Sequence, residues 1–284
     1  MSDIVQSGRL VLAGTPLGRV SDASPGLIEA LRTADVIAAE DTRRLYRLAT
    51  DLGVTITARL VSYYESVEQS RIPGLLAHIA DGATVVLVTD AGMPSVSDPG
   101  YRLVAAATEA GIRVTAVPGP SAVLTALALS GLPSDRFTFD GFPPRRPGER
   151  RRFLTALSGE RRTMVFFESV HRLDDCLSAM VEAFGGDRPA ALCRELTKTY
   201  EEVRRGTLAE LAAGAGDVRG EVTLVVAGST ATTEVPDVDA LAAEVAALVD
   251  GGLSRRDAVD AVAGSYHLPR RTVYSAATGH GGAE

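Results

Sequence analysis

The sequence predicts an α/β fold, and three observations support that prediction. Short apolar runs alternate along the chain with segments that carry helical signals. Helix-starting pairs such as Ser24–Pro25 fall between these runs; a serine caps free backbone amides and a proline fits the first helical position. The 284 residues, 45% of them hydrophobic, can bury a large core and favour more than one domain.

The first half of the chain supplies four expected strands, which are Leu10–Ala13, Val36–Ala39, Val85–Thr89 and Ile112–Val117. Helical segments separate them, and this alternation indicates a mostly parallel sheet with helices on its faces. Ser24 is expected to cap the helix after the first strand. Asp98, which precedes Pro99, is expected to cap a later one. These elements predict an N-terminal α/β domain over residues 1–130.

A turn-rich stretch, Ser130–Asp135, separates this part from a second α/β domain over residues 131–232. The strands expected there are Phe137–Phe142, Met164–Glu168, Ala190–Glu195 and Val222–Ala227. A linker at 229–237 leads into an alanine-rich helical tail, residues 233–284, and no internal repeat is visible.

The tail predicts two short helices within residues 253–277. The first begins after Ser254, which has Asp257 three residues further on, and the second begins at Pro269. Each starts with a pair of arginines. This spacing resembles a helix-turn-helix. A helical cap packed on the second domain is the alternative.

Composition narrows the class of protein. The formal net charge of −7 argues against a protein that coats nucleic acid non-specifically. No apolar run is long enough to span a membrane and the first thirty residues do not resemble a signal peptide, so a cytoplasmic protein is expected. Cys176 and Cys193 have no Cys or His partner nearby and are expected to be buried, reduced thiols. No metal site is visible.

Positive charge is nevertheless concentrated locally. Five arginines occupy eight positions from Arg145 to Arg152, and the chain has 28 Arg against a single Lys, Lys198. Clusters of this kind are typical either of solvated helix faces or of surfaces that bind nucleic-acid phosphates. The isolation of Lys198 makes it a candidate for a specific role.

Four polar loops follow expected strands, at Ala13–Gly18, Ala39–Arg44, Thr89–Pro94 and Pro118–Ala122. Because the carboxyl ends of parallel strands meet at one edge of a sheet, these loops predict a ligand cleft. Neither a dinucleotide fingerprint nor a P-loop is present, so phosphate is not the expected ligand. A carboxylate at Asp90, followed by two small residues, suits a hydroxyl or ammonium group. An aspartate that only caps its own turn is the alternative.

Six stretches form an ordered set of motifs: AGTPLGRVSDASPGLIEALRTADVIAAEDTRR, DAGMPSVSDPGYRLV, PGPSAVLTALALSGLPSDRFTFDGFPPRR, FFESVHRL, CRELTKTYEEVRRGTL and GEVTLVVAG. Together they resemble the tetrapyrrole-methylase superfamily, and specifically its ribosomal branch of 16S rRNA (cytidine-2′-O)-methyltransferases. The resemblance runs from about Arg9 to about Ala276. Any one motif is weak, but six in order are specific.

The resemblance implies two α/β domains of the class III methyltransferase type, with S-adenosylmethionine in the cleft between them, and a homodimer. The substrate it implies is 16S rRNA in the small ribosomal subunit, with no metal. Relatives commonly carry Thr where this chain has Met93, so contact through backbone or apolar surface is expected there. The donor-pocket residues implied are Thr15, Pro16, Asp90, Ala91, Gly92, Met93, Ser121, Ala122, Phe167, Leu192 and Cys193.

Methyl transfer to a ribose hydroxyl needs alignment and help for a weakly acidic nucleophile. A base, or a cation that stabilises the developing alkoxide, would supply that help. The candidates are Lys198, Glu168 and Asp41. Lys198 can act either way because the pKa of a lysine falls readily on burial. A surface ion pair with Glu195 or Glu202 is the alternative.

The residues expected to contact RNA are Arg43, Arg145, Arg146, Arg150, Arg151, Arg152, Arg255, Arg256, Arg270 and Arg271. In the ribosomal branch, the helical tail is expected to help engage RNA. Scattered cations favour RNA over a porphyrin as substrate. Two other functions stay open: a C-methyltransferase of cobalamin or porphyrin biosynthesis, and a non-catalytic ribosome-assembly factor.

Overall fold

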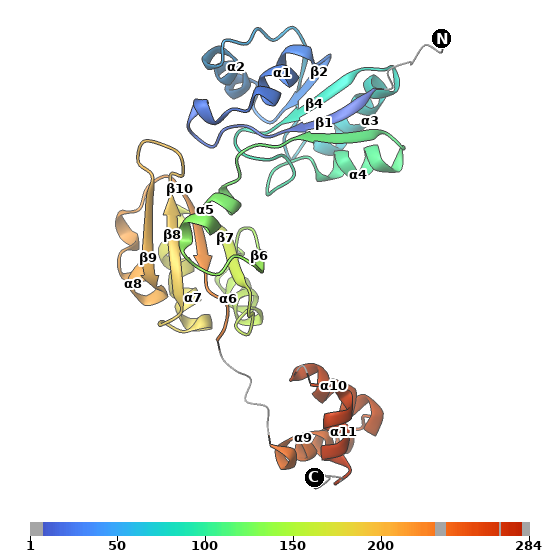
Figure 1. Cartoon of the computed structure of the whole chain (residues 1–284), viewed down its shortest axis with the longest axis vertical. Helices are drawn as coiled ribbons and strands as arrows, with labels where there is room; N and C mark the ends of the chain where they lie inside the picture. The colour runs from blue at the N-terminus through green and yellow to red at the C-terminus, as the bar shows by residue number, and fades with distance from the viewer. Residues whose placement is uncertain (1–7, 231–236, 267, 280–284) are drawn as a thin grey trace. The chain divides into compact units, whose positions relative to one another are not determined.

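The computed structural model describes residues 8–230, 237–266 and 268–279. The chain divides into two compact units, Met1–Ser229 and Thr230–Glu284. The first unit holds two five-stranded sheets with helices packed on them, and the described part of the second unit is helical (Figure 1). The α/β class predicted from the sequence is therefore confirmed.

The first unit contains strands and α-helices in alternation through most of its length. No helix among the described residues of the chain is both long enough and apolar enough to cross a membrane. In chain order the elements are β1 (Arg9–Ala13), α1 (Pro25–Thr33), β2 (Val36–Ala39), α2 (Thr42–Asp51), β3 (Arg59–Ser62), α3 (Glu68–Ala80), β4 (Thr84–Val88), α4 (Tyr101–Glu109), β5 (Arg113–Val117), α5 (Ala122–Ser130), β6 (Phe137–Phe139), α6 (Pro147–Ala156), β7 (Thr163–Ser169), α7 (Leu173–Phe184), β8 (Pro189–Arg194), β9 (Glu202–Thr207), α8 (Leu208–Ala213) and β10 (Glu221–Val226). Short 3-10 turns lie at Val20–Asp22, Val170–Arg172 and Ala215–Asp217.

The first sheet is entirely parallel, with the strand order β3-β2-β4-β1-β5. In its centre Leu10 of β1 pairs with Val85 of β4 on one side and with Val114 of β5 on the other. Parallel pairing brings the carboxyl ends of the strands to the same edge. The loops predicted to form a cleft therefore all start from that edge.

Alternate residues along β1 pack on opposite faces of this sheet. Leu10 and Leu12 join the core under α3 and α4, whereas Val11 and Ala13 join the core under α1 and α2. Figure 1 shows these helix pairs on the two sides of the sheet. Burial on both faces explains why the sequences of the inner strands β2 and β4 are almost continuous apolar runs.

The second sheet is mixed, with the order β6-β7-β10-β8-β9. Strand β6 pairs parallel with β7, and the other neighbours pair antiparallel. Strand β9 was not among the predicted strands because its sequence, EVRRGT, is polar, as an edge strand can be. The polar-ended β3 was missed for a similar reason, and β6 stops at Phe139 where the prediction extended to Phe142.

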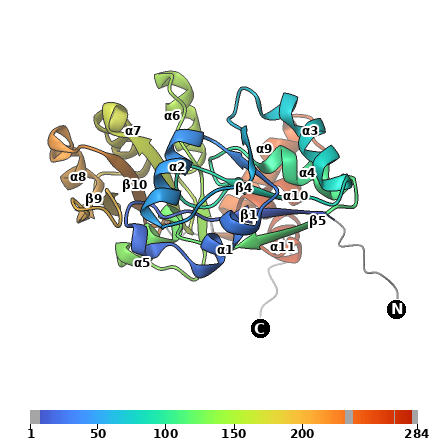
Figure 2. The same ribbon diagram turned by 90° about the horizontal axis from the view of Figure 1, so that it is seen from above.

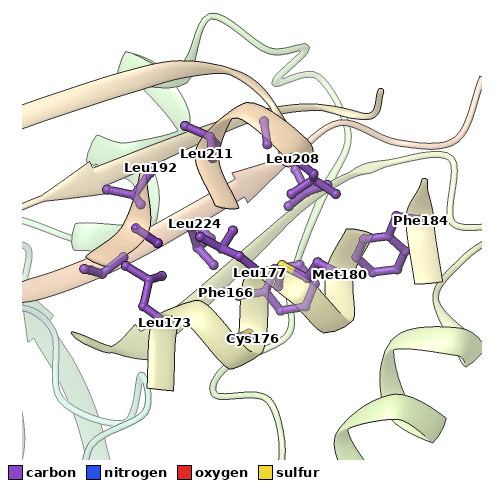
Figure 3. Close-up of a cluster of buried hydrophobic side chains, with 14 of the residues drawn as sticks. Phe166, Leu173, Cys176, Leu177, Met180, Phe184, Leu192, Leu208, Leu211 and Leu224 are labelled. Atoms are coloured by element: carbon purple, nitrogen blue, oxygen red, sulfur yellow. The ribbon is translucent and has the colours of Figure 1, made fainter. Parts of the chain in front are cut away.

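Both faces of the second sheet are also covered. Phe166 of β7 and Leu224 of β10 pack under α6, α7 and α8, in the cluster drawn in Figure 3. Their neighbours Val165 and Val225 point to the other face and pack against α5. Figure 2 shows α5 and α7 on opposite sides of this sheet. Helix α5 directly follows the last strand of the first sheet, so it belongs to both halves of the unit.

The second unit consists, in its described part, of α9 (Val238–Asp250), α10 (Arg255–Ser265) and α11 (Arg270–Ala277). The two predicted helices are present, and α9 precedes them. Ser254 caps α10, since its hydroxyl accepts a hydrogen bond from the Asp257 amide at 3.2 Å. The three helices enclose their own core, which includes Leu241, Val245, Val259, Val262 and Val273. Most of the predicted linker, residues 231–236, lies outside the described residues.

The prediction that Asp98 caps a helix is wrong. Helix α4 begins at Tyr101 with Gly100 as its N-cap, and no side chain of the cap position bonds to the first turn. The Gly100 amide instead donates to Oε1 of Glu68, a buried residue of α3, at 3.0 Å. The Glu68 carboxylate, from a different helix, therefore bonds to the start of α4, and Asp98 does not cap this helix.

Candidate active site

A cavity of about 410 Å³ lies at the carboxyl edge of the first sheet, bordered on its other side by β7 and β10 of the second sheet. Both sheets belong to the same compact unit. The residues that line it are Leu17, Glu40, Arg44, Asp90, Ala91, Gly92, Met93, Val96, Ser97, Asp98, Ser121, Ala122, Val123, Phe142, Phe167, Glu168, Ser169, Gly220, Glu221, Val222 and Thr223. A smaller cavity of about 190 Å³ shares Leu17, Glu40, Arg44 and Asp90 with it.

Close backbone approaches shape the floor of the larger cavity. The loops after β1 and β5 meet at Gly14 and Gly119, where a Cβ on Gly119 would lie 2.8 Å from backbone atoms of Gly14. The loop after β1 also forms an isolated bridge with the loop after β4, through Thr15 and Gly92. Gly92 has φ +80, a left-handed conformation that glycine adopts without strain. These contacts place the first-sheet loops side by side.

Gly119→Ala is expected to lower the free energy of unfolding by about 1–3 kcal/mol, because the new methyl group overlaps backbone that cannot rotate away. Gly74→Ala is a matched control, since a Cβ at this position of α3 meets nothing within 4 Å. That control should be neutral or should stabilise the protein by up to about 1 kcal/mol. Thermal or urea denaturation of both variants measures the difference. Equal stabilities would contradict the close approach.

Carboxylates hold the loops after β2 and β4 to each other. Oε2 of Glu40 accepts the Asp90 amide at 3.1 Å, and Oδ1 of Asp90 accepts the Asp41 amide at 3.2 Å. Nη1 of Arg44 lies 3.3 Å from Oδ2 of Asp90. The Asp90 side chain thus has structural contacts and still lines the cavity.

The cavity is acidic, and burial raises the pKa of three of the carboxyl groups that line it. Burial, followed by the nearby Glu40 carboxylate, raises the pKa of Asp98 to about 7. Burial also raises the pKa of Glu40 and of Asp90. Carboxylates crowded in a partly buried space suit a cationic ligand, which would lower the pKa of each group.

Lys198 does not line the cavity. Its Nζ donates to Oε1 of Glu195 and to Oε2 of Glu221, each at 3.0 Å. Burial alone lowers the pKa of Lys198, but the hydrogen bonds to both carboxylates outweigh burial and leave that pKa raised. The side chain is therefore an ammonium paired with Glu195, one of the two partners considered from the sequence. Its link to the cavity is Glu221, which lines it.

Glu168 and Asp41 are both tied to arginines. The Glu168 side chain is fully buried and pairs with Arg172, whose Nε donates to Oε1 at 2.8 Å. Asp41 caps α2 and pairs with Arg43 at 2.7 Å, and these hydrogen bonds hold the pKa of Asp41 far below its usual range. A carboxylate that holds a proton so weakly is a poor base.

The structure brings most of the residues implied for the donor together, and sets a few apart. Of that set, Asp90, Ala91, Gly92, Met93, Ser121, Ala122 and Phe167 line the larger cavity. Thr15 and Pro16 line the smaller one, and the Thr15 hydroxyl donates to the Thr89 carbonyl at 3.1 Å. Leu192 and Cys193 lie in the two cores of the second sheet, outside the lining of either cavity.

The expected RNA-binding arginines also differ in exposure. Arg145, Arg146, Arg151 and Arg152 are on the surface near the start of α6, whereas Arg150 is 5% exposed and pairs with Asp175 at 3.4 Å. The Arg43 side chain is 89% exposed. In the second unit Arg255, Arg256, Arg270 and Arg271 are exposed, and Arg270 pairs with Asp260. Arg150 is thus an interior residue in this structure.

Both cysteines are free and buried, as the sequence predicted. Burial raises the pKa of Cys193 to about 11, and burial together with Glu168 raises that of Cys176 above its usual range. Neither thiol is poised to react. Among the described residues, no group of three His, Cys, Asp or Glu side chains is arranged to hold a metal ion.

Residues 9–212 match the family model described as Tetrapyrrole (Corrin/Porphyrin) Methylases. The chain belongs to the tetrapyrrole methylase family. Several relatives of this tetrapyrrole methylase carry the name Ribosomal RNA small subunit methyltransferase I. The protein from Mycobacterium tuberculosis (strain ATCC 25618 / H37Rv) is 54% identical over 274 residues, which cover 96% of this chain and 95% of the relative. The one from Escherichia coli O157:H7 is 40% identical, covering 94% and 93%.

Solved structures of other methyltransferases share the fold of this tetrapyrrole methylase. The methyltransferase CobJ is 24% identical with a TM-score of 0.61, covering 81% of this chain and 98% of that one. Uroporphyrin-III C-methyltransferase from Thermus thermophilus, solved with S-adenosyl homocysteine, is 21% identical with a TM-score of 0.54, covering 78% and 97%. At these identities the likeness establishes the fold alone.

The lining residues that sequence reasoning missed include Glu40, Asp98, Phe142 and Glu221. Glu40 directly follows a buried strand, so the argument that selected Asp90 would have found it. Asp98 gave no such signal, because an aspartate before a proline is typical of a helix cap. Phe142 lies in the loop after β6 and Glu221 begins β10, and nothing local in the sequence indicates that either faces the cavity.

Proposed function

We propose that this chain transfers a methyl group from S-adenosylmethionine to the 2′-hydroxyl of a cytidine in 16S rRNA of the small ribosomal subunit. One observation carries the proposal: an acidic cavity lies on the fold of a methyltransferase family whose members named for ribosomal RNA are 40–54% identical to this chain. The corrin and porphyrin enzymes that share the fold are only 18–24% identical. This difference favours rRNA over the C-methylation of a tetrapyrrole.

The lining of the cavity suits the proposed donor in its charge and its apolar surface. S-adenosylmethionine supplies a methyl group on a positively charged sulfonium and carries an ammonium group as well. Glu40, Asp90 and Asp98 provide negative charge, and the apolar rings and side chains of Phe167, Met93 and others provide a surface for a base. Gly92 has no side chain, and a Cβ added there would lie 3.5 Å from Cδ2 of Leu17. Its absence lets a ligand approach the backbone of the loop after β4 closely.

The donor-binding residues proposed are Asp90 to Met93 from the loop after β4, Ser121 and Ala122 at the start of α5, and Phe167 from β7. Ser121 caps α5 through its hydroxyl, which fixes the loop after β5. Thr15 holds the loop after β4 through its bridge to Gly92, and Pro16 follows it in the lining of the smaller cavity. Leu192 and Cys193 act only through packing. None of these roles requires a metal ion.

An exposed aromatic side chain at the cavity favours RNA as the second substrate. Phe142 lines the cavity, is 54% exposed, and packs its ring against Phe167 with 5.6 Å between centroids. Arg145 and Arg146 follow it in the same loop and are exposed. An aromatic platform beside arginines is typical of sites that bind single-stranded RNA, where bases stack and cations hold the phosphates.

Phe142→Ala is expected to weaken binding of the RNA substrate by about 1–3 kcal/mol, the range for loss of one stacked base. Donor affinity should change little because Phe167 remains as an apolar wall. Filter binding of small subunits and calorimetry with the donor measure the two affinities separately. Phe153→Ala is not a suitable control because Phe153 packs against the core. Tyr64→Ala is one, since Tyr64 is an exposed aromatic residue in the loop after β3 and lines neither cavity. Equal RNA affinity for Phe142→Ala and its parent would remove Phe142 from the interface.

The remaining parts of the proposal concern the whole chain. We propose that residues 1–130 and 131–232 act as the two catalytic domains and that residues 233–284 help to engage RNA through their exposed arginines. The resemblance to tetrapyrrole methylases supports a homodimer, which light scattering after gel filtration tests. A ribosomal-subunit substrate supports a cytoplasmic site of action, which we include in the proposal.

The function is tested with small subunits from a bacterial strain that lacks the modification. Purified protein and labelled S-adenosylmethionine should transfer label to 16S rRNA, and resistance to alkaline cleavage should map it to a ribose. Calorimetry with the donor alone separates the alternatives. No donor binding supports a non-catalytic assembly factor, and donor binding with transfer to uroporphyrinogen but not to RNA supports a C-methyltransferase.

A further inference from the structure

We infer that Glu68 is a positioning residue for donor binding, because its carboxylate holds the far end of the loop after β4. This inference rests on the function proposed above and assigns a task to a residue that lines neither cavity. The loop after β4 consists of residues 89–100 and leads into α4. Much of the lining of the larger cavity comes from this loop, including Asp90 and Met93.

The second half of this loop has few strong contacts of its own. Ser95 and Ser97 have φ +72 and +59, left-handed conformations that cost energy for residues with a side chain. The backbone hydrogen bonds here are long: the Val96 amide donates to the Met93 carbonyl at 3.4 Å, and the Ser95 amide donates to the Pro99 carbonyl at 3.3 Å. The Ser95 hydroxyl is buried without a partner among the described residues. The conformation of this half therefore depends on what holds its ends.

The two ends of the loop are held by different parts of the chain. The first end is joined to the loop after β1 through the Thr15–Gly92 bridge. The second end is held by Glu68, which begins α3. Oε1 of Glu68 accepts the Gly100 amide at 3.0 Å and also the Tyr63 hydroxyl at 3.0 Å. Helices α3 and α4 lie side by side (Figure 1), so this carboxylate reaches from the start of one helix to the start of the other.

Gly100 passes the position of Glu68 on to the rest of the loop. A Cβ added to Gly100 would lie 2.6 Å from Oγ of Ser95 and 2.8 Å from Cδ2 of Leu87 in β4. The backbone at Gly100 is therefore packed directly against Ser95, with no room between them. Because of this packing, Gly100 cannot shift toward the loop unless Ser95 and the lining residues next to it shift as well.

The surroundings of Glu68 stabilise a buried carboxylate. Its side chain is 7% exposed, and neither α3 nor α4 has a hydrogen bond from a capping side chain at its start. The positive ends of both helix dipoles favour a negative group at this place. Nε of Arg102 lies 4.0 Å from Oε2 and adds a positive charge. Burial and the hydrogen bond to Glu68 raise the pKa of Tyr63, so the Tyr63 hydroxyl keeps its proton and remains a donor.

Loss of the Glu68 acceptor would leave the Gly100 amide unpaired and would release the second end of the loop. The donor would then bind only the fraction of molecules in which the loop has the correct conformation, so its apparent affinity would fall by that fraction. Once bound, the donor would hold the loop in place of Glu68. The role of Glu68 is therefore expected to affect donor binding and not the rate of methyl transfer at saturating donor.

Two substitutions separate the reach of Glu68 from its charge. Glu68→Asp keeps the charge but shortens the side chain by a methylene group, so the carboxylate no longer reaches the Gly100 amide. Glu68→Gln keeps the length and an oxygen that can accept both hydrogen bonds. In calorimetry with S-adenosylmethionine, Glu68→Asp should bind about 5- to 100-fold more weakly than the parent, the effect of leaving a buried amide unpaired. Glu68→Gln should bind within about threefold of the parent.

Ile79→Ala is the control for a general loss of stability. Ile79 is buried near the other end of α3, and the substitution leaves a cavity in the core under this helix. Its melting temperature should fall, and its donor affinity should match that of the parent. The proposal is overturned if Glu68→Asp and Ile79→Ala lose donor affinity equally. It is also overturned if Glu68→Gln loses as much affinity as Glu68→Asp, because charge would then be the cause.

Two further readouts distinguish positioning from a purely structural role. With small subunits as substrate, Glu68→Asp should raise KM for the donor and keep the rate at saturating donor within about threefold of the parent. Hydrogen exchange followed by mass spectrometry should show faster exchange of a peptide covering residues 95–102 in Glu68→Asp, and saturating donor should restore its protection. A reduced rate with unchanged KM, or exchange equal to that of the parent, overturns the proposal.

Failure of this inference can be told apart from failure of the proposed function. If the parent binds no donor, or binds it without methylating small subunits, the proposed function fails, and exchange of the 95–102 peptide still tests the contact between Glu68 and the loop. If the parent methylates small subunits and Glu68→Asp binds the donor equally well, the function stands and the role of Glu68 fails.

Discussion

Arg172→Ala is expected to lower the free energy of unfolding by about 3–5 kcal/mol, because it leaves a buried carboxylate without its counter-charge. The Glu168 side chain is fully buried on β7, and Arg172 at the start of α7 donates two hydrogen bonds to its Oε1. Glu168 Oε1 also accepts the Ser169 amide at 2.7 Å. At about 2–4 °C for each kcal/mol in a protein of this size, the melting temperature should fall by roughly 6–20 °C.

Two further variants make this result specific. Arg151 forms an ion pair with Glu182 on the surface, and the two side chains are 71% and 60% exposed. Arg151→Ala should therefore change the free energy of unfolding by less than about 1 kcal/mol. Adding Glu168→Gln to Arg172→Ala removes the unpaired charge and should recover part of the loss. Differential scanning calorimetry measures all of them. If Arg172→Ala and Arg151→Ala were equally mild, the buried pair would not stabilise the fold.

Asp90→Asn is expected to weaken binding of S-adenosylmethionine by about 10- to 150-fold, the value of a hydrogen bond between charged groups. Asparagine retains an oxygen for the Asp41 amide, which Asp90 accepts at 3.2 Å, so the loops after β2 and β4 stay joined. What the substitution removes is the negative charge that faces a cationic donor. Isothermal titration calorimetry gives the affinity directly.

A neutral ligand separates the charge of Asp90 from its part in the loop. Methylthioadenosine has the nucleoside of the donor without its charged sulfonium or amino-acid group, so its affinity should be the same for Asp90→Asn and the parent. Asp81→Asn, at the exposed C-terminal end of α3, is the surface control and should leave the affinity for both ligands unchanged. If both ligands lost affinity equally, Asp90 would act through the shape of the cavity, and Glu40 would become the leading partner for the positive charge.

The arrangement of the first sheet could be predicted because its signals are local. The run Val85–Thr89 was predicted as a strand because its apolar residues suit burial on both faces, and the structure has β4 at Thr84–Val88. Ser24 caps α1 as predicted, with its hydroxyl accepting the Leu27 amide at 3.0 Å. Once these strands are parallel, geometry places the loops after them at one edge. That edge, and Asp90 on it, therefore followed from the order of the residues.

The second sheet was harder to predict because it is mixed. Strand β10 pairs antiparallel with β7 and β8, which both lie well before it in the chain, and the edge strand β9 has three charged residues. The sequence contains no local signal for which strands pair across such distances. The side chains that β7 and β10 present to the cavity, such as Phe167 and Glu221, depended on that pairing.

By itself the sequence determined the α/β class, four of the five strands of the first sheet, the buried thiols and the family, because hydrophobic periodicity, capping pairs and ordered motifs are properties of neighbouring residues. Only the tertiary structure decided what the charged residues do. Glu68, thirty positions before Asp98, bonds to the start of α4, and Asp98 lines the cavity instead. Arg150 is buried and pairs with Asp175 of α7. Lys198 forms ion pairs with Glu195 and Glu221. A charge acts on whatever lies within a few ångströms of it, and folding brings those partners together from distant parts of the chain.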